Sequence, residues 1–204
     1  MEILYDKALR ESVFNKILDL VKYDVSYDFW NKYFQEEMAQ RKTMKQDFTP
    51  PNVADFLAQL TEKIGNDNAT DNGMRYEGAA GTGSLIIAKW HRDRMKNCPF
   101  CYRPSNYVYI CEELSERAFP FLVFNMAIRG MNGAAVHCDV LTRECHGVFF
   151  MSNDTDNVTS FSSVNVMPYS KQAENYFKVK FVDEKYKPLV ESPLIEHMFK
   201  EADT

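Results

Sequence analysis

The chain has 204 residues, 45% of them hydrophobic, and a formal net charge of −5. This size suits one α/β domain with a small appendage, and the negative charge excludes a protein that grips nucleic acid with its whole surface. Phosphate contacts must therefore come from local basic patches or from a partner.

The sequence predicts neither a signal peptide nor a membrane-spanning segment. The N-terminus lacks the basic-then-apolar order of a signal peptide, and no apolar run approaches the ~18 residues that cross a membrane. Five scattered cysteines are typical of reduced thiols. We therefore expect a soluble, cytoplasmic protein with no membrane contact.

The first part of the chain is predicted to be helical. Residues 1–45 form a small helical N-terminal region in this interpretation, and residues 46–204 form the main domain. Thr49 and Pro50 predict the start of a further helix, because threonine can cap a helix and proline is tolerated in its first turn. The expected buried face of that helix consists of Val53, Phe56, Leu57, Leu60 and Ile64.

From residue 74 onward, strands and helices alternate, which predicts right-handed βαβ crossovers and an open, mainly parallel α/β sheet flanked by helices. The predicted strands are 74–77, 107–111 and 134–138, with helices at 84–96 and 115–129 between them. Further on, polar loops replace the long helices. The later predicted elements are strands at 148–151, 164–167 and 176–182, and a short helix at 194–200.

The most informative stretch joins the first strand to its helix and reads Tyr-Glu-Gly-Ala-Ala-Gly-Thr-Gly-Ser, residues 76–84. Gly81 and Gly83 can take positive φ and carry no Cβ, so a nucleoside can lie close against the main chain. The spacing is neither the G-x-G-x-x-G of dinucleotide sites nor the G-x-x-x-x-G-K of triphosphate sites. An acid, Glu77, four residues before Gly-Thr-Gly is instead typical of S-adenosylmethionine-dependent methyltransferases.

Two further acidic positions follow predicted strands. Glu112 and Glu113 close the second strand, and Asp139 closes the third. In a parallel nucleotide-binding sheet, an acid after the second strand accepts hydrogen bonds from the ribose hydroxyls. An acid after the third strand can accept one from an adenine amino group.

Four segments together resemble the N-6 adenine DNA methylases, above all the modification subunits of type I restriction systems. They are residues 46–51, 77–83, 112–114 with 125–130, and 138–141. The resemblance implies a Rossmann-like methyltransferase fold and S-adenosylmethionine as cofactor. A Phe-Thr-Pro segment covers its methionine end, a Gly-x-Gly turn approaches it, a glutamate holds the ribose and an aspartate meets the adenine. The residues that the resemblance assigns to cofactor binding are Phe48, Thr49, Pro50, Glu77, Gly78, Ala79, Gly81, Gly83, Glu113, Asp139 and Leu141.

The sequence departs from this family at the catalytic motif. Such enzymes carry Asn/Asp-Pro-Pro-Tyr/Phe, whose polar side chain and a main-chain carbonyl accept hydrogen bonds from the amino group of a flipped adenine while the ring stacks on the base. The nearest counterpart here is Met167-Pro168-Tyr169, which puts a thioether, a poor acceptor, in the acceptor position. Asn153 and Asp154 offer acceptors after an earlier strand, but without proline or an aromatic ring. Glu77 also replaces the usual aspartate, as a longer acid that should still serve.

Cys98 and Cys101 form a C-x-x-C pair. Zinc would need two more ligands, and the other cysteines and histidines show no matching spacing. A thioredoxin-like role requires the pair at a helix N-terminus, whereas this pair follows a predicted helix. We therefore predict an unligated turn and no metal site.

The resemblance implies methyl transfer to the exocyclic amine of adenine in DNA. Because no target-recognition domain is recognisable, DNA specificity would come from a separate subunit. The missing Asn-Pro-Pro-Tyr leaves catalysis open. The alternatives are a non-catalytic, methylase-derived interaction or decoy module and a methyltransferase acting on a non-DNA substrate.

Overall fold

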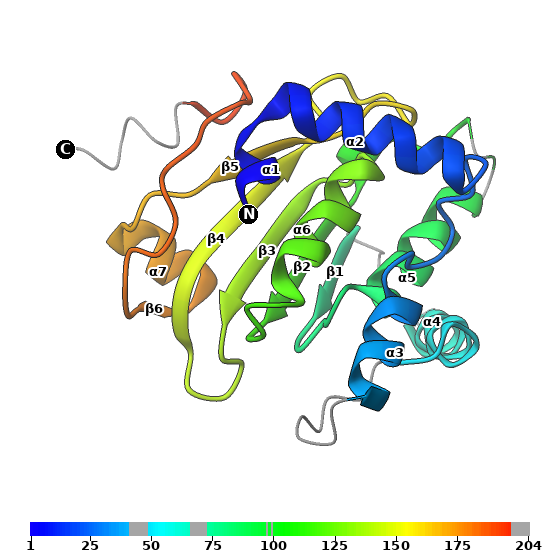
Figure 1. Ribbon diagram of the computed structural model, residues 1–204, viewed down its shortest axis with the longest axis horizontal. Helices are drawn as coiled ribbons and strands as arrows, with labels where there is room; N and C mark the ends of the chain where they lie inside the picture. The colour runs from blue at the N-terminus through cyan, green and yellow to red at the C-terminus, as the bar shows by residue number, and fades with distance from the viewer. Residues whose placement is uncertain (41–48, 66–72, 97, 99, 197–204) are drawn as a thin grey trace.

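The computed structural model describes residues 1–40, 49–65, 73–96, 98 and 100–196 (Figure 1). Within these residues lies an open sheet of six strands in the order β1-β2-β3-β4-β5, with β6 paired to β4. The strands are β1 (Met74–Glu77), β2 (Val108–Glu113), β3 (Gly133–Cys138), β4 (Glu144–Ser152), β5 (Ser163–Val166) and β6 (Lys180–Phe181). The predicted α/β class is confirmed.

The first three strands form the parallel part of the sheet. α5 (Ser84–Met95) connects β1 to β2, and α6 (Phe119–Ile128) connects β2 to β3. Because each helix returns the chain to the same starting edge, the carboxyl ends of the three strands meet at one edge of the sheet. β4 then runs antiparallel to β3, and β5 runs antiparallel to β4.

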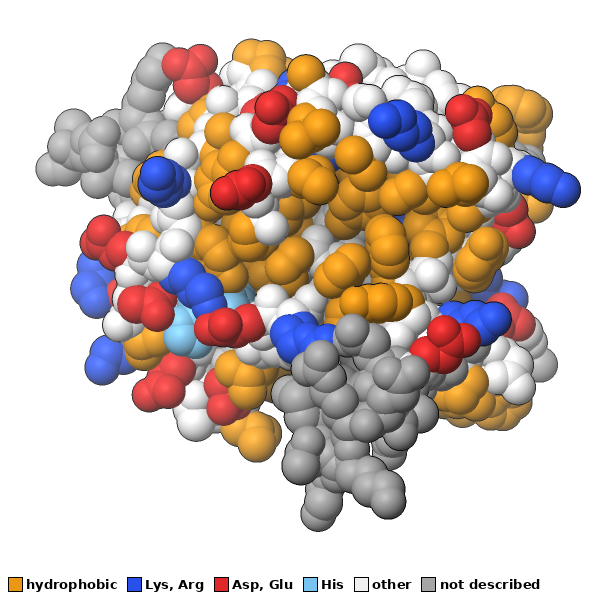
Figure 2. All heavy atoms as spheres, in the orientation of Figure 1, with side chains coloured by type: hydrophobic (Ala, Val, Ile, Leu, Met, Phe, Trp, Pro, Cys, Tyr) orange, Lys and Arg blue, Asp and Glu red, His pale blue; other side chains and the backbone are white. Residues whose placement is uncertain are grey.

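Two N-terminal helices, α1 (Glu2–Tyr5) and α2 (Lys7–Leu20), pack onto the face of the sheet that α6 covers (Figure 1). A third, α3 (Asn31–Gln40), packs on α6 through Phe34, whose ring lies 5.1 Å from the Phe121 ring. Leu4 and Phe14 belong to the same buried core as α5 and α6, and the Phe14 ring meets the Phe124 ring edge-on at 4.7 Å. Figure 2 shows hydrophobic side chains gathered across the middle of this face. The domain boundary expected at residue 45 lies outside the described residues.

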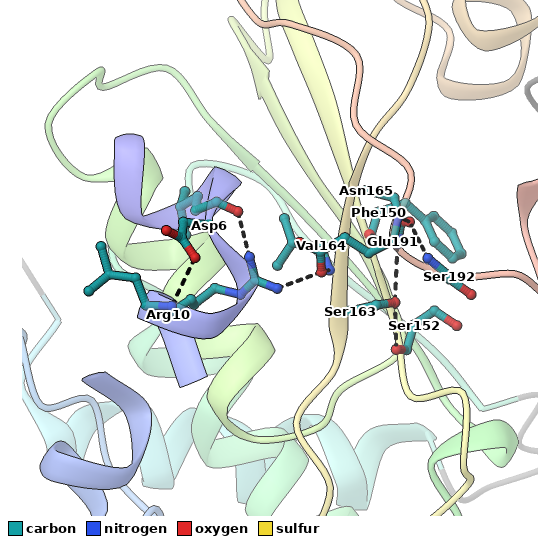
Figure 3. Close-up of polar contacts among 11 residues, drawn as sticks. Asp6, Arg10, Phe150, Ser152, Ser163, Val164, Asn165, Glu191 and Ser192 are labelled. Carbon is teal, nitrogen blue, oxygen red and sulfur yellow. Dashed lines mark hydrogen bonds and ion pairs between the residues drawn. The ribbon is translucent and has the colours of Figure 1, made fainter. Parts of the chain in front are cut away.

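Polar contacts tie α2 to β5 and to the C-terminal segment (Figure 3). Arg10, which is 1% exposed, pairs with Glu191 at 2.5 Å, and the same carboxylate oxygen accepts the backbone N–H of Val164. The side-chain carbonyl of Asn165 accepts the backbone N–H groups of Glu191 and Ser192. Elements from both ends of the chain therefore stabilise the sheet.

The opposite face of the sheet carries a second, smaller core, which includes Val136, Val148 and Met167. α7 (Lys171–Phe177) and β6 follow β5 on this side. The prediction of a strand at 176–182 is wrong over most of its length. Ser170 caps α7 by accepting the backbone N–H of Ala173, and the helix ends where the backbone becomes left-handed. Of the helix predicted at 194–200, only residues 194–196 are described.

The expected buried face of α4 (Pro51–Gly65) is also wrong at three of its five residues, whereas Leu57 is half-buried and the Ile64 side chain lies outside the described part. Ala54 and Ala58 are each 1% exposed, whereas Val53, Phe56 and Leu60 are 41%, 61% and 42% exposed. α4 packs against α5. Small alanine side chains let the two backbones approach closely, so the alanine side of the helix turns inward and the larger apolar side chains remain at the surface.

Candidate functional site

The glycine-rich turn between β1 and α5 adopts an unusual backbone. Ala79, Gly81 and Gly83 have φ of 57°, 60° and 97°. A Cβ built on Gly83 would lie 3.0 Å from Leu122 Cδ1, so this position favours glycine for its space as well as its φ. The non-glycine Ala79 in a left-handed conformation is strained, which is common where a backbone is shaped to meet a ligand.

A cavity of about 440 Å³ opens at this turn, at the carboxyl ends of β1, β2 and β3. This volume lies within the range of small-molecule sites. Three of the lining side chains are acidic, and none of the described ones is basic. The lining residues are Thr49, Glu77, Ala79, Ala80, Gly81, Ser84, Leu85, Glu113, Leu114, Ala118, Asp139, Val140 and Leu141.

The structure brings seven of the predicted cofactor residues together in this cavity. They are Thr49, Glu77, Ala79, Gly81, Glu113, Asp139 and Leu141. Pro50, Gly78 and Gly83 neighbour lining residues in the chain without lining the cavity themselves. Phe48 lies outside the described residues.

The two adjacent glutamates at the end of β2 point to opposite faces of the sheet, as strand alternation requires. Glu113, 6% exposed, accepts the backbone N–H groups of Gly81 and Ser115, each at 2.6 Å. Glu112 instead pairs with Arg143 at 2.6 and 2.9 Å and does not line the cavity. Only Glu113 can therefore meet a ligand there, and it also fixes the glycine turn.

The remaining acids of the cavity differ in their protonation. Burial raises the pKa of Glu77 to about 8, and the nearby charges of Glu113 and Asp28 add to this. The backbone N–H groups of Leu141 and Thr142 donate to Asp139 and hold its pKa below the ordinary value. At neutral pH Glu77 is therefore protonated and Asp139 is ionised.

A buried aspartate behind the glycine turn was missed by sequence reasoning. Asp28, 5% exposed, accepts hydrogen bonds from the hydroxyls of Thr82 and Ser84. Its other oxygen accepts Asn125 Nδ2 at 2.9 Å and the backbone N–H of Trp30 at 3.0 Å. No local pattern marks Asp28, because its side-chain partners lie more than fifty residues away along the chain.

Asn31 extends this network to the segment expected to cover the cofactor. Its Nδ2 donates to the Thr49 carbonyl at 2.9 Å and to the Ser84 hydroxyl at 2.8 Å. Asn31 of the N-terminal region thus holds Thr49 beside Ser84, directly after the glycine turn. Leu114, another lining residue that was not assigned, is the last residue of the Glu-Glu-Leu motif, which could have indicated it.

The predicted catalytic segment does not reach the cavity. Met167, 7% exposed, belongs to the second core. Tyr169 donates its hydroxyl to the His146 carbonyl at 3.0 Å and accepts the backbone N–H of Tyr186 at 2.7 Å. None of Met167, Pro168 and Tyr169 lines the cavity, and β4 lies between β5 and β3. Their catalytic role stays a prediction.

The other candidate acceptors, Asn153 and Asp154, follow β4 at the opposite edge of the sheet, because β4 runs antiparallel to β3. Asn153 Nδ2 donates to the carbonyls of Gly130 and Asn157, and Asp154 accepts the hydroxyl of Ser192 at 2.6 Å. These side chains shape the loop after β4.

Neither a metal cluster nor a membrane-spanning helix occurs among the described residues. No three or more histidine, cysteine or acidic residues there are grouped so as to hold a metal ion. No helix in that part of the chain has the length and apolar character to span a bilayer.

An open α/β sheet with a glycine turn and an acidic cavity at the ends of its parallel strands is a Rossmann-like methyltransferase fold. The chain belongs to the N-6 DNA methylase family, whose model matches residues 24–199. The matched range includes every lining residue of the cavity as well as Asp28 and Asn31. No curated protein and no solved structure matches the chain.

Proposed function

We propose that the cavity binds S-adenosylmethionine and that the chain is the cofactor-binding domain of an adenine DNA methylase. The observation that carries this proposal is the acidic lining of the cavity: it has three acidic side chains, one of which, Glu77, is protonated at neutral pH, and no basic one among the described lining residues. Such a site repels phosphates, which argues against nucleotides and dinucleotides. It attracts a nucleoside with positive charge, and S-adenosylmethionine carries a sulfonium and an ammonium group.

The lining residues suit the parts of this cofactor. Glu113 keeps lone pairs free for the ribose hydroxyls, since each of its oxygens accepts one backbone N–H. Asp139 accepts a hydrogen bond from the adenine amino group. Leu114 and Leu141, 51% and 91% exposed, offer apolar contact to the adenine ring. Exposed leucines at the rim of a cavity are unfavourable until a ligand covers them.

Glu77 responds to the cofactor's positive charge. With no cation beside it, the buried Glu77 carboxyl is protonated at neutral pH. A cation beside the carboxyl favours its ionised form, so binding releases this proton. The affinity for S-adenosylmethionine should therefore rise with pH up to about 8.

Methyl transfer to adenine in DNA is the reaction of the family, and the chain contributes the methyl donor's site to it. With a net charge of −5, the chain depends on a separate specificity subunit to bind and select DNA. In this proposal the chain and its specificity subunit belong to a cytoplasmic restriction-modification system.

A second candidate function is cofactor binding without transfer. It is favoured by the buried Met167 and by the Tyr169 hydroxyl, whose hydrogen bonds are used within the fold. Transfer of a labelled methyl group to DNA, measured with and without cell extract as a source of the partner, separates the two functions. Transfer only with extract supports the methylase, whereas binding without transfer under both conditions supports the non-catalytic module.

Titration calorimetry tests the shared part of both functions. S-adenosylmethionine should bind in the micromolar range, and ATP should not bind. Asp139→Ala should weaken binding by about 1.5–3 kcal/mol, the contribution of a hydrogen bond to a charged group. The matched control is Asp24→Ala, because the exposed Asp24 also accepts a backbone N–H two residues on but lies outside the cavity. No heat at millimolar cofactor, or equal binding of ATP, would refute the proposal.

A further inference from the structure

The loop between α5 and β2 contains a pair of thiols unlike the other cysteines of the chain. Cys98 is partly exposed and Cys101 is exposed, whereas the remaining cysteines are fully buried. This loop enters β2 at its amino end, so it lies at the opposite edge of the sheet from the acidic cavity. Its chemistry is therefore separate from the proposed cofactor site.

A tight turn brings the two thiols together. The backbone N–H of Cys101 donates to the Cys98 carbonyl at 2.8 Å, which closes a four-residue turn. Such a turn keeps its end Cα atoms within about 7 Å, close to the separation that a disulfide spans. A disulfide could thus form with little movement of the backbone.

The residues around the pair hold the turn on one side and leave it open on the other. Tyr102, directly after Cys101, is 6% exposed, and its ring stacks on Tyr107 with centroids 5.3 Å apart. Phe100, between the cysteines, is 89% exposed. An anchored turn with an open outer side is accessible to a small thiol reagent.

We propose that Cys98 and Cys101 are a redox pair, which exchange with a low-molecular-weight disulfide converts from a dithiol to an intrachain disulfide. The Cys98 thiolate attacks one sulfur of the small disulfide, forming a mixed disulfide and releasing one small thiolate, which takes up a proton. Cys101 loses its proton to water and attacks Cys98 Sγ, which releases the second small thiolate. Two protein thiols are oxidised, and one small disulfide is reduced to two thiols.

The two thiols influence each other's ionisation. Hydrogen bonding with the Cys101 thiol and with backbone N–H groups lowers the pKa of Cys98, and the same contact with Cys98 raises the pKa of Cys101. We therefore assign the first attack to Cys98, and the two single-serine variants test this order. This activation comes from the turn itself and does not need the helix N-terminus of a thioredoxin site.

The test uses the full chain equilibrated with mixtures of reduced and oxidised glutathione, acid-quenched, alkylated and analysed by mass spectrometry. As the mixture becomes oxidising, the peptide that contains both cysteines should change from a doubly alkylated form to an unalkylated form with two hydrogens fewer than the free dithiol. Cys101→Ser should stop the reaction at one glutathione on Cys98, and Cys98→Ser should abolish the intrachain disulfide. Cys111, Cys138 and Cys145 serve as internal controls and should stay reduced in the folded chain.

Three results would overturn the proposal: both thiols remaining free in fully oxidised glutathione, a disulfide between two chains as the main product, or no glutathione adduct on Cys98 in Cys101→Ser. Because both side chains lie at the surface, the variants should unfold at the same urea concentration as the parent. A loss of folding therefore cannot imitate the expected result.

Discussion

Replacing Glu77 by Gln should stabilise the unliganded protein and weaken its binding of S-adenosylmethionine. Glutamine has nearly the same shape and can still accept the backbone N–H of Ile86, which now donates to Glu77 at 2.8 Å. The substitution therefore removes one property of Glu77, its ability to ionise. Its effect on stability and its effect on binding have opposite signs.

The effect on stability follows from the raised pKa of Glu77. Between pH 4.5 and about 8, the folded chain keeps a proton on Glu77 that the unfolded chain has lost, so rising pH destabilises the fold. A shift over that whole interval corresponds to roughly 5 kcal/mol at ~1.36 kcal/mol per pH unit. Because the cavity admits water to Glu77, we expect about 2–3 kcal/mol at pH 8. Below pH 4.5 both states are protonated and the advantage of glutamine disappears.

Urea denaturation of the parent and Glu77→Gln at intervals from pH 4 to pH 8 measures this difference. The variant should gain stability over the parent as pH rises, and Glu144→Gln, at an exposed position, should follow the parent. In calorimetry, the parent's affinity for the cofactor should increase with pH while that of Glu77→Gln stays flat. Parallel stability curves for the parent and Glu77→Gln would refute the reasoning.

Three further substitutions test the packing around the site by urea denaturation. Gly83→Ala should cost about 1–3 kcal/mol, since φ is 97° and the new Cβ would press on Leu122; an unchanged midpoint would contradict the left-handed turn. Asp28→Asn should cost about 2–4 kcal/mol, because the buried donors around Asp28 lose a charged acceptor, whereas the exposed Asp19→Asn should be neutral. Phe56→Ser should change stability by less than about 0.5 kcal/mol, and a large loss would show that the apolar face of α4 is buried.

The parallel half of the fold and its acids could be predicted because both follow from local pattern and one rule of geometry. Met74–Glu77 was predicted as a strand and is β1. The carboxyl ends of parallel strands meet at one edge, so Glu77, Glu113 and Asp139 were expected together, and all three line the cavity. Strand alternation places Glu113 and Glu112 on opposite faces of the sheet. The strand pattern alone does not say which of the two faces the cavity, and the family resemblance assigned Glu113.

Other features were not predicted, either because they depend on partners far away in the sequence or because a local helix cap outweighs the apolar pattern. Asp28 acts through side chains that chain folding brings to it from α5 and α6. On α4, the larger apolar residues suggested the buried face, but close packing on α5 selected Ala54 and Ala58. At α7, apolar residues indicated a strand, while the cap at Ser170 and the left-handed Lys178 set the limits of a helix.

The connection after β3 decides where a catalytic segment can lie. Residues 139–143 form a short link that ends in a left-handed Arg143 (φ 64°) and turns the chain directly into antiparallel β4. A strand after β3 that paired in parallel with β1, next to the cavity, would need a much longer connection, usually one that contains a helix. β5 and Met167 therefore lie on the far side of β4 from the cavity. The acids that suit a cofactor come from the parallel half of the sheet, whereas the Met-Pro-Tyr segment belongs to the antiparallel half. The cavity proposed for the cofactor and the segment predicted to carry the transfer are thus positioned by different elements, so the proposed cofactor binding does not depend on Met167, Pro168 and Tyr169.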